Sequence, residues 1–475
     1  MAEQFDPVAY INTPRWRSSR LGLDRTRELL AGLGNPQDRL RVVHVAGTNG
    51  KGSTCAFLAS ILQRAGYKTG LFTSPYIVEF ADRIRVDGRN IAPHDLLDVT
   101  LAVREVAEAM PDHPTEFELM TAVAFEHFAR EACDICVVEV GLGGRLDSTN
   151  VLAAPEACII TPIALDHTEL LGDTLEAIAG EKAGIVKPDV PLVSAPQDPA
   201  AMGVIAAAAA RQHAPFTCVD ADQLDGTPSC FSYRGWQDLA LGLLGSYQTV
   251  NAATALEAVG VLRAHGWNIP DEAVREGLAN TVWPGRFERI GDDPTFIVDG
   301  GHNPQGAQVL IESLEQCYPG RPVLFVMGVL GDKDYRAMVS QVVGYALTRM
   351  VICIEPPNPR ALSTGDLARA LQDELDAQNA RAAREHPFTR PVHEVMIREA
   401  KSIEAGVEAA MRIAWDLSDD KLVRDSKADP FSWLLGWSNA PTFVNPIVVA
   451  CGSLYSVADV TRAHHAVLAL EQGAE

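Results

Sequence analysis

Short apolar runs alternate with helical stretches along the first part of this chain. Such runs are typical of buried parallel strands, and the longer stretches between them carry the mixed pattern of surface helices. The alternation predicts a doubly wound, mainly parallel α/β sheet. The predicted strands are residues 42–46, 68–72, 135–140, 157–163 and 190–195.

The first part continues past residue 195, and a second, smaller alternation begins at residue 295. Helices are expected at 200–213 and 248–265, with a turn-rich, strand-like segment at 214–245. The apolar runs of the second part lie at 295–299, 323–329, 350–354 and 447–451.

Two domains are therefore expected, with a hinge at Trp283-Pro-Gly-Arg286. The first, residues 1–287, begins with a short helical segment, and the second, residues 288–475, is a smaller Rossmann-like α/β domain. Residues 415–445 are predicted to be an insertion of unassigned role.

Composition and charge narrow the function. The chain has 475 residues, 47% of them hydrophobic, and a formal net charge of -22, which argues against a nucleic-acid binder. No stretch reads as a signal peptide or membrane span, so we expect a cytoplasmic protein without a membrane partner. Nine scattered cysteines include Cys133-Asp-Ile-Cys136. Without a second such pair, buried reduced thiols are favoured over a metal or redox site.

The richest candidate site is the glycine loop, defined here as Gly47-Thr48-Asn49-Gly50-Lys51-Gly52-Ser53. It joins an apolar strand to a helix, the arrangement in which backbone N–H groups, a helix N-terminus and a lysine hold nucleotide phosphates. The spacing is unusual, because Gly52 separates Lys51 from Ser53. The alternative is a glycine-rich turn with a solvated lysine.

Further polar clusters follow other predicted strands. Glu139 and His167, at strand ends, suit Mg²⁺, with Asp166 orienting the imidazole. The alternatives are a Glu139–Arg145 ion pair and a structural histidine. By pattern alone, Lys182 is a solvated lysine in a helix that ends at Gly184. Asp299-Gly-Gly-His302-Asn303-Pro304 suits ligand binding, or else a helix cap with a turn histidine.

Together these motifs resemble the folylpolyglutamate synthase/dihydrofolate synthase family, a branch of the Mur ligase superfamily. The resemblance runs through nearly the whole chain. It departs at Tyr76, where the family usually has His, and at Ser148 and Gly301, where it usually has Ala. The matching motifs are Leu21–Arg25, Leu33–Gln37, His44–Ser53, Ser74-Pro75, Arg83-Ile84, Glu139–Asn150, Asp166-His167, Glu181–Gly184, Pro284–Arg286, Asp299–Pro304, Gly331–Asp334 and Gly452–Tyr455.

The resemblance implies a P-loop, Mur-ligase-like first domain and a glutamate-ligase second domain. It implies ATP-driven amide bond formation, in which a carboxylate of dihydropteroate or folate is phosphorylated and the acyl phosphate is attacked by L-glutamate. Expected cofactors are ATP, Mg²⁺ and a monovalent cation such as K⁺. The expected assembly is a monomer.

The resemblance also assigns roles to residues. Catalytic roles fall on Lys51, His167, Lys182 and His302. ATP is expected to contact the glycine loop, Asn251, Arg286 and Asp299. The implied Mg²⁺ ligands are Ser74, Glu139, His167 and Lys182 as its carbamate, and the implied substrate contacts are Asp147, His302 and Ser453.

Three alternatives stay open. A peptidoglycan-type Mur ligase usually carries a domain before the loop, and only 46 residues precede Gly47. A nucleotide-dependent switch needs the loop but not Glu139, His167 and Lys182. A non-catalytic paralogue is the third. The motifs do not distinguish a dihydrofolate synthase, a folylpolyglutamate synthase and a bifunctional enzyme.

Overall fold

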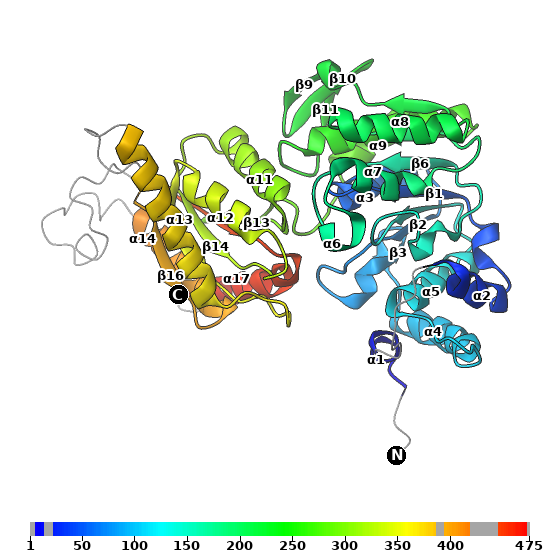
Figure 1. The fold of residues 1–475 in the computed structure, drawn as a ribbon, viewed down its shortest axis with the longest axis horizontal. Helices are drawn as coiled ribbons and strands as arrows, with labels where there is room; N and C mark the ends of the chain where they lie inside the picture. Colours follow the sequence, from blue (N-terminus) through cyan, green and yellow to red (C-terminus); the bar gives the residue numbers. More distant parts are fainter. Residues whose placement is uncertain (1–4, 14–21, 386–393, 419–444, 473–475) are drawn as a thin grey trace, which may run out of the picture. The chain divides into compact units, whose positions relative to one another are not determined.

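The computed structural model describes residues 5–13, 22–385, 394–418 and 445–472, which fall into two compact units (Figure 1). The first comprises Met1–Gly242 and Tyr247–Trp283, and the second Leu243–Ser246 and Pro284–Glu475. The change of unit after Trp283 lies within the segment predicted as a hinge. Most of the predicted insertion, residues 419–444, lies outside the described residues.

The first unit is built on an eight-stranded sheet of order β4-β3-β2-β5-β1-β6-β7-β8. Only the β2–β3 and β3–β4 pairs are antiparallel. A three-stranded antiparallel sheet, β11-β10-β9, follows along the chain. The strands are β1 (Val42–Ala46), β2 (Thr69–Phe72), β3 (Ile84–Val86), β4 (Arg89–Asn90), β5 (Ile135–Glu139), β6 (Ala157–Ile160), β7 (Leu192–Ser194), β8 (Phe216–Cys218), β9 (Leu224–Thr227), β10 (Cys230–Tyr233) and β11 (Trp236–Ala240).

Helices cover both faces of the large sheet. On one face α4 and α5 share a core with Val42, Phe72 and Val138. Because side chains alternate along a strand, the neighbouring residues point to the other face, where α3 packs on β1, β2 and β5 and against α9 and α10. The helices are α1 (Pro7–Asn12), α2 (Asp24–Gly32), α3 (Lys51–Arg64), α4 (Pro93–Ala107), α5 (Glu116–Arg130), α6 (Thr168–Leu171), α7 (Leu175–Lys182), α8 (Pro199–Arg211), α9 (Gln248–Ala264) and α10 (Asp271–Ala279).

The second unit is a six-stranded sheet of order β12-β13-β17-β14-β15-β16, parallel except for β12. Helices α11, α12 and α13 share one hydrophobic core with the strands of this sheet. Helices α14 and α17 pack against each other and contact the sheet. The elements are β12 (Glu288–Asp292), β13 (Thr295–Val298), α11 (Pro304–Cys317), β14 (Val323–Met327), α12 (Tyr335–Gly344), β15 (Thr348–Cys353), α13 (Thr364–Glu385), β16 (Met396–Glu399), α14 (Ile403–Ser418), β17 (Ile447–Cys451) and α17 (Val457–Gln472).

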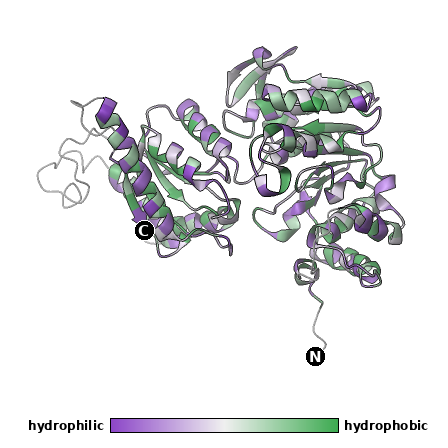
Figure 2. Cartoon of the chain, viewed as in Figure 1, coloured by the Kyte–Doolittle hydropathy of each residue, from purple (hydrophilic) through white to green (hydrophobic). Residues whose placement is uncertain are grey.

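The predicted fold class is confirmed: a doubly wound, mainly parallel sheet and a second α/β unit. The central strands consist of hydrophobic residues, whereas α13 contains many hydrophilic residues (Figure 2). The second sheet begins one strand earlier than predicted, because β12 is a polar, partly exposed edge strand without an apolar run. Within the described ranges, none of the helices has the length and apolar character that crossing a membrane would need.

Candidate active site

The first unit gathers its polar residues where the strand order reverses. Strand β1 lies between β5 and β6, although β2 follows it in sequence. The segments after these strands leave the same edge of the sheet, because all three run parallel. Ligands of open α/β sheets bind in the crevice at such a switch point.

The glycine loop turns sharply from β1 into α3. Gly47 has φ +150° and Gly50 has φ +82°, which side-chain-bearing residues avoid. The loop is fixed to the segment after β6, because the backbone N–H groups of Thr48 and Asn49 donate to the Pro162 carbonyl at 3.0 and 3.1 Å. Helix α3 begins at Lys51, so the backbone N–H groups of its first turn are not used by hydrogen bonds within the helix. This geometry suits an anion.

Lys51 connects the loop to a carboxylate on the next strand. Its Nζ donates to the Thr48 carbonyl at 3.1 Å and lies 3.8 Å from Oε1 of Glu139. Glu139 is buried at the end of β5, and its Oε2 accepts a hydrogen bond from the Ser74 backbone N–H at 3.2 Å. Arg145, the alternative partner of Glu139, instead pairs with Glu181 at 2.8 Å. Lys51, Ser74 and Glu139 therefore lie together.

Lys182 corrects the expectation of a solvated lysine. Its side chain is buried, and Nζ donates to the Gly47 carbonyl at 2.7 Å. Helix α7 ends here, with a short 3-10 turn at Ala183–Ile185. Burial, reinforced by the Lys51 charge and opposed by Asp166 and Asp147, lowers the pKa of Lys182 to about 7. The amine is thus held against the glycine loop in a form that loses its proton near neutral pH.

Asp147 shapes the segment that follows β5. Its carboxylate is buried and accepts from the backbone N–H groups of Leu142 at 2.9 Å and Thr149 at 3.0 Å, and from the Thr149 hydroxyl at 2.5 Å. Burial raises the pKa of Asp147, against these hydrogen bonds. His44, on β1, lies with Nε2 2.8 Å from the same hydroxyl.

His44 was not predicted as a site residue, although a histidine within an apolar strand is a visible signal. Because the Thr149 hydroxyl donates to Asp147, His44 must donate through Nε2–H. Burial, with Lys187 nearby, lowers the pKa of His44 to about 3, so the ring is neutral.

His167 follows β6 and adopts a left-handed backbone conformation, with φ 51°. Its backbone N–H donates to Oδ1 of Asp166 at 2.8 Å, and its Nε2 lies 3.9 Å from that oxygen. No group of three or more His, Cys, Asp or Glu side chains suited to a metal occurs in the described part of the chain. A metal here would need hydroxyl, water or phosphate oxygens as further ligands.

Helix α9 brings two amides to the glycine loop. Asn251 lies so close to Gly50 that a Cβ there would be 2.3 Å from its Oδ1. Its Nδ2 donates to Oε1 of Gln248 at 2.9 Å, and Nε2 of Gln248 donates to the Ser53 hydroxyl at 3.3 Å. Gln248 is fully buried and was missed in the sequence, because a glutamine at a helix start carries no specific signal.

The second unit carries its own group at the ends of neighbouring strands β13 and β17. The Asp299 carboxylate accepts from the backbone N–H groups of Phe287 and Gly301, each at 2.8 Å. Nδ1 of His302 lies 3.1 Å from the Gly300 carbonyl, and buried Ser453 caps the turn after β17. A Cβ on Gly300 would lie 3.3 Å from Nη1 of Arg286. Asn303, not His302, caps α11.

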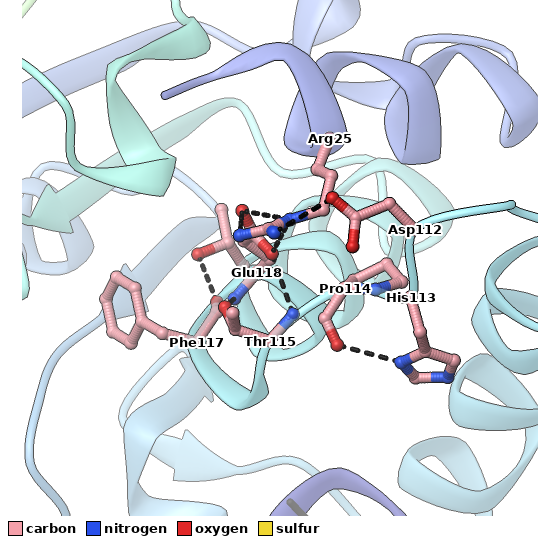
Figure 3. Close-up of polar contacts among 8 residues, drawn as sticks. Arg25, Asp112, His113, Pro114, Thr115, Phe117 and Glu118 are labelled. Carbon is pink, nitrogen blue, oxygen red and sulfur yellow. Dashed lines mark hydrogen bonds and ion pairs between the residues drawn. The ribbon is translucent and has the colours of Figure 1, made fainter. Parts of the chain in front are cut away.

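A buried ion pair anchors the start of α5 in the first unit (Figure 3). Arg25 donates through Nε to Oε2 of Glu118 at 3.0 Å and through Nη2 to Oε1 at 3.1 Å. Glu118 also accepts from the Thr115 N–H at 2.7 Å, which closes a capping box. The ring of Phe117 covers Gly141, where a Cβ would lie 2.4 Å from Cζ.

Comparison with known proteins identifies the family. Residues 45–259 match the Mur ligase middle domain, and residues 285–416 match the Mur ligase, glutamate ligase domain. The chain is 40% identical over 357 residues to the dihydrofolate synthase/folylpolyglutamate synthase of Bacillus subtilis (strain 168), covering 70% of this chain and 83% of the relative.

Solved structures agree with this match. Mycobacterium tuberculosis folylpolyglutamate synthase complexed with ADP superposes with a TM-score of 0.78 and 29% identity, covering 98% of this chain and 99% of that chain. E. coli FolC in complex with DHPP and ADP gives a TM-score of 0.77 and 28% identity, with 97% of each chain covered. The resemblance seen in the motifs is confirmed, and the chain belongs to the dihydrofolate synthase/folylpolyglutamate synthase family of ATP-dependent Mur ligases.

Proposed function

We propose that this chain joins L-glutamate to dihydropteroate, to folates or to both, through an acyl phosphate, releasing ADP and phosphate. The observation that carries the proposal is buried Lys182, held against the glycine loop beside Lys51 and Glu139. A nucleotide switch needs only the glycine loop, whereas a ligase of this family needs Lys51, Glu139 and Lys182 together.

The proposed chemistry begins at the glycine loop. Its backbone N–H groups and the Lys51 ammonium would bind the β- and γ-phosphates and offset negative charge as the γ-phosphoryl group moves to the substrate carboxylate. Asn251 is proposed to contact the adenine, and Asp147 and Phe117 to lie toward the acid substrate. The amino group of L-glutamate then attacks the acyl carbon, and phosphate leaves. His302 and Ser453 are proposed to hold glutamate, and Arg286 and Asp299 the nucleotide.

We propose Ser74, Glu139, His167 and carbamylated Lys182 as Mg²⁺ ligands. The donor set fits a hard cation, because Glu139 is a buried carboxylate next to Ser74 and a carbamate would add further oxygens. Bound Mg²⁺ would neutralise phosphate charge. A pKa of about 7 makes Lys182 about 90% neutral at pH 8, against less than about 1% for an ordinary lysine. The neutral amine is the form that adds to CO₂, with loss of a proton.

We further propose a K⁺ requirement, a monomeric assembly and a cytoplasmic location. All predicted site residues lie on one chain, which supports a monomer. The nine cysteines are all free, which supports a reducing compartment. Light scattering should give the mass of one chain, and omission of K⁺ should lower turnover. A dimer mass, or full activity without K⁺, would contradict these points.

The deciding experiment measures ADP release with Mg²⁺ and L-glutamate, in separate reactions with dihydropteroate and with a reduced folate. Release only with dihydropteroate identifies a dihydrofolate synthase, release only with folate a folylpolyglutamate synthase, and release with both a bifunctional enzyme. A chain that binds ADP but produces none from ATP in either reaction would refute the proposed function.

A further inference from the structure

Trp283 packs on the glycine loop, although no motif marks it as a site residue. It is buried, and it is the last residue of the first unit. A Cβ built on Gly52 would lie 2.8 Å from its Nε1 and 3.1 Å from both Cε2 and Cζ2. The indole therefore lies against the first turn of α3, between Lys51 and Ser53 in sequence.

The indole also contacts the strand that follows the Ser74 segment. Cζ of Arg85, on β3, lies 5.1 Å from the Trp283 ring centroid, within the range of a cation–π contact. Nε of Arg85 donates to the Asp82 carbonyl at 3.1 Å, which fixes the guanidinium. Trp283 thus connects α3 to β3.

This packing explains the unusual spacing of the loop. Gly52 lies inside α3 and lacks the positive φ of Gly47 and Gly50. Alanine forms helices better than glycine, so the backbone alone favours alanine at this position. The atoms that would meet a Cβ at Gly52 belong to the Trp283 ring.

The indole nitrogen points to a role beyond filling space. Nε1 is buried and has no hydrogen-bond partner in the described structure, which is a cost that phenylalanine or leucine would avoid. The fit of the large ring to Gly52 and Arg85 therefore accounts for a tryptophan at this position.

We propose that Trp283 is a positioning residue for nucleotide binding: it holds the first turn of α3 in the conformation that receives the phosphates. A loop that is already ordered loses less conformational entropy when the ligand binds. This inference rests on the proposed binding of nucleotide phosphate by the glycine loop.

The test measures ADP affinity by calorimetry in the full chain. Trp283→Leu should weaken ADP binding about tenfold, and Gly52→Ala should weaken it at least as much. In the Trp283→Leu background, Gly52→Ala should have an effect of less than about twofold, because the ring that opposes the Cβ is gone. Trp283→Phe, which keeps an aromatic ring, should show a smaller loss than Trp283→Leu.

Trp267→Leu is the matched control. Its ring also stacks under an arginine, with Cζ of Arg41 5.4 Å from the centroid, but Arg41 precedes β1, at the edge of the sheet opposite the glycine loop. ADP affinity should be unchanged in this variant.

Two outcomes overturn the inference. The first is unchanged ADP affinity in Trp283→Leu, even if the variant is less stable. The second is an equal loss from Gly52→Ala in both backgrounds. If Trp283→Leu does not fold, Trp283→Phe serves as the background: phenylalanine lacks the indole Nε1 and Cζ2 atoms that oppose the Cβ, so Gly52→Ala should cost less there than in the unmodified chain. Failure of the unmodified chain to bind ADP would instead refute the proposed function.

Discussion

The Arg25–Glu118 pair allows a quantitative test of how the first unit is held together. Both side chains are at least nine-tenths buried, and hydrogen bonds of 3.0 and 3.1 Å join them. Removing one partner of a buried ion pair leaves an uncompensated charge and costs about 3–5 kcal/mol. Arg25→Met should therefore destabilise the first unit by about that amount, because Glu118 keeps only its capping contacts.

The double variant should be much less affected. Replacing both partners of a buried pair with apolar residues is often neutral. Arg25→Met with Glu118→Met removes both charges but also the capping box at Thr115, worth about 1 kcal/mol. We expect a net cost of about 1 kcal/mol, well below that of either single variant.

Urea unfolding followed by circular dichroism measures these costs. Because the chain has two units, two transitions are expected, and the one that Arg25→Met shifts is assigned to the first unit, which contains both partners of the pair. Arg27→Met is the control, since the Arg27–Asp24 pair is exposed and should contribute less than about 0.5 kcal/mol. A double variant that costs as much as the sum of the single variants would refute the reasoning.

Three further predictions follow, two on the proposed chemistry and one on acid stability. Lys182→Ala should abolish ligation but not ADP binding, and short carboxylates should restore part of the turnover. NMR with labelled bicarbonate should show a carbamate only in the unmodified chain. Undiminished turnover in the variant would contradict the proposed role of Lys182 as a carbamylated Mg²⁺ ligand. Glu139→Gln should raise the Mg²⁺ concentration for half-maximal ADP release about tenfold, and an unchanged Mg²⁺ titration would remove Glu139 from the ligand set. His44 lowers the free energy of unfolding in acid. Its pKa is about 3 in the folded chain and 6.5 when exposed, so below pH 6.5 the proton binds to the unfolded chain but not to the folded one. This difference lowers the free energy of unfolding by about 2 kcal/mol at pH 5. The urea midpoint should therefore fall less between pH 8 and pH 5 in His44→Val than in the unmodified chain, and an equal fall in both would contradict the buried neutral ring.

The sequence predicted the strands that are buried on both faces, since these have continuous apolar runs. It did not predict β12, whose polar residues form a partly exposed edge. Nor did it predict the strand order, with β5 between β2 and β1, because pairing between distant segments depends on how helices pack across the sheet. That order is what brings Ser74, Glu139 and the glycine loop to one edge.

Site residues could be predicted where neighbouring residues form a distinctive motif, but not where their position depends on the packing of distant segments. The glycine loop is visible because its residues and flanking elements are contiguous. The burial of Lys182 is not visible, since it depends on the distant Gly47 carbonyl. Gln248 carries no local signal, and Trp283 was marked only as the start of the predicted hinge. Their contacts to Ser53 and Gly52 arise only when α3, α9 and the end of the first unit come together.

Two lysines at one loop have different surroundings, and this difference assigns their roles. Lys51 faces the Glu139 carboxylate, whereas the polar contact of Lys182 is the uncharged Gly47 carbonyl. The charge of Lys51 adds to burial in lowering the pKa of Lys182. Lys51 therefore favours the neutral amine that adds to CO₂, and a carbamate on Lys182 would in turn be attracted to Lys51.

Lys51→Met should consequently reduce the Lys182 carbamate as well as phosphate binding. The labelled-bicarbonate signal at pH 7.5, measured without nucleotide, separates the two effects. An undiminished signal would show that burial alone sets the proton affinity of Lys182, and the two lysines would then act independently.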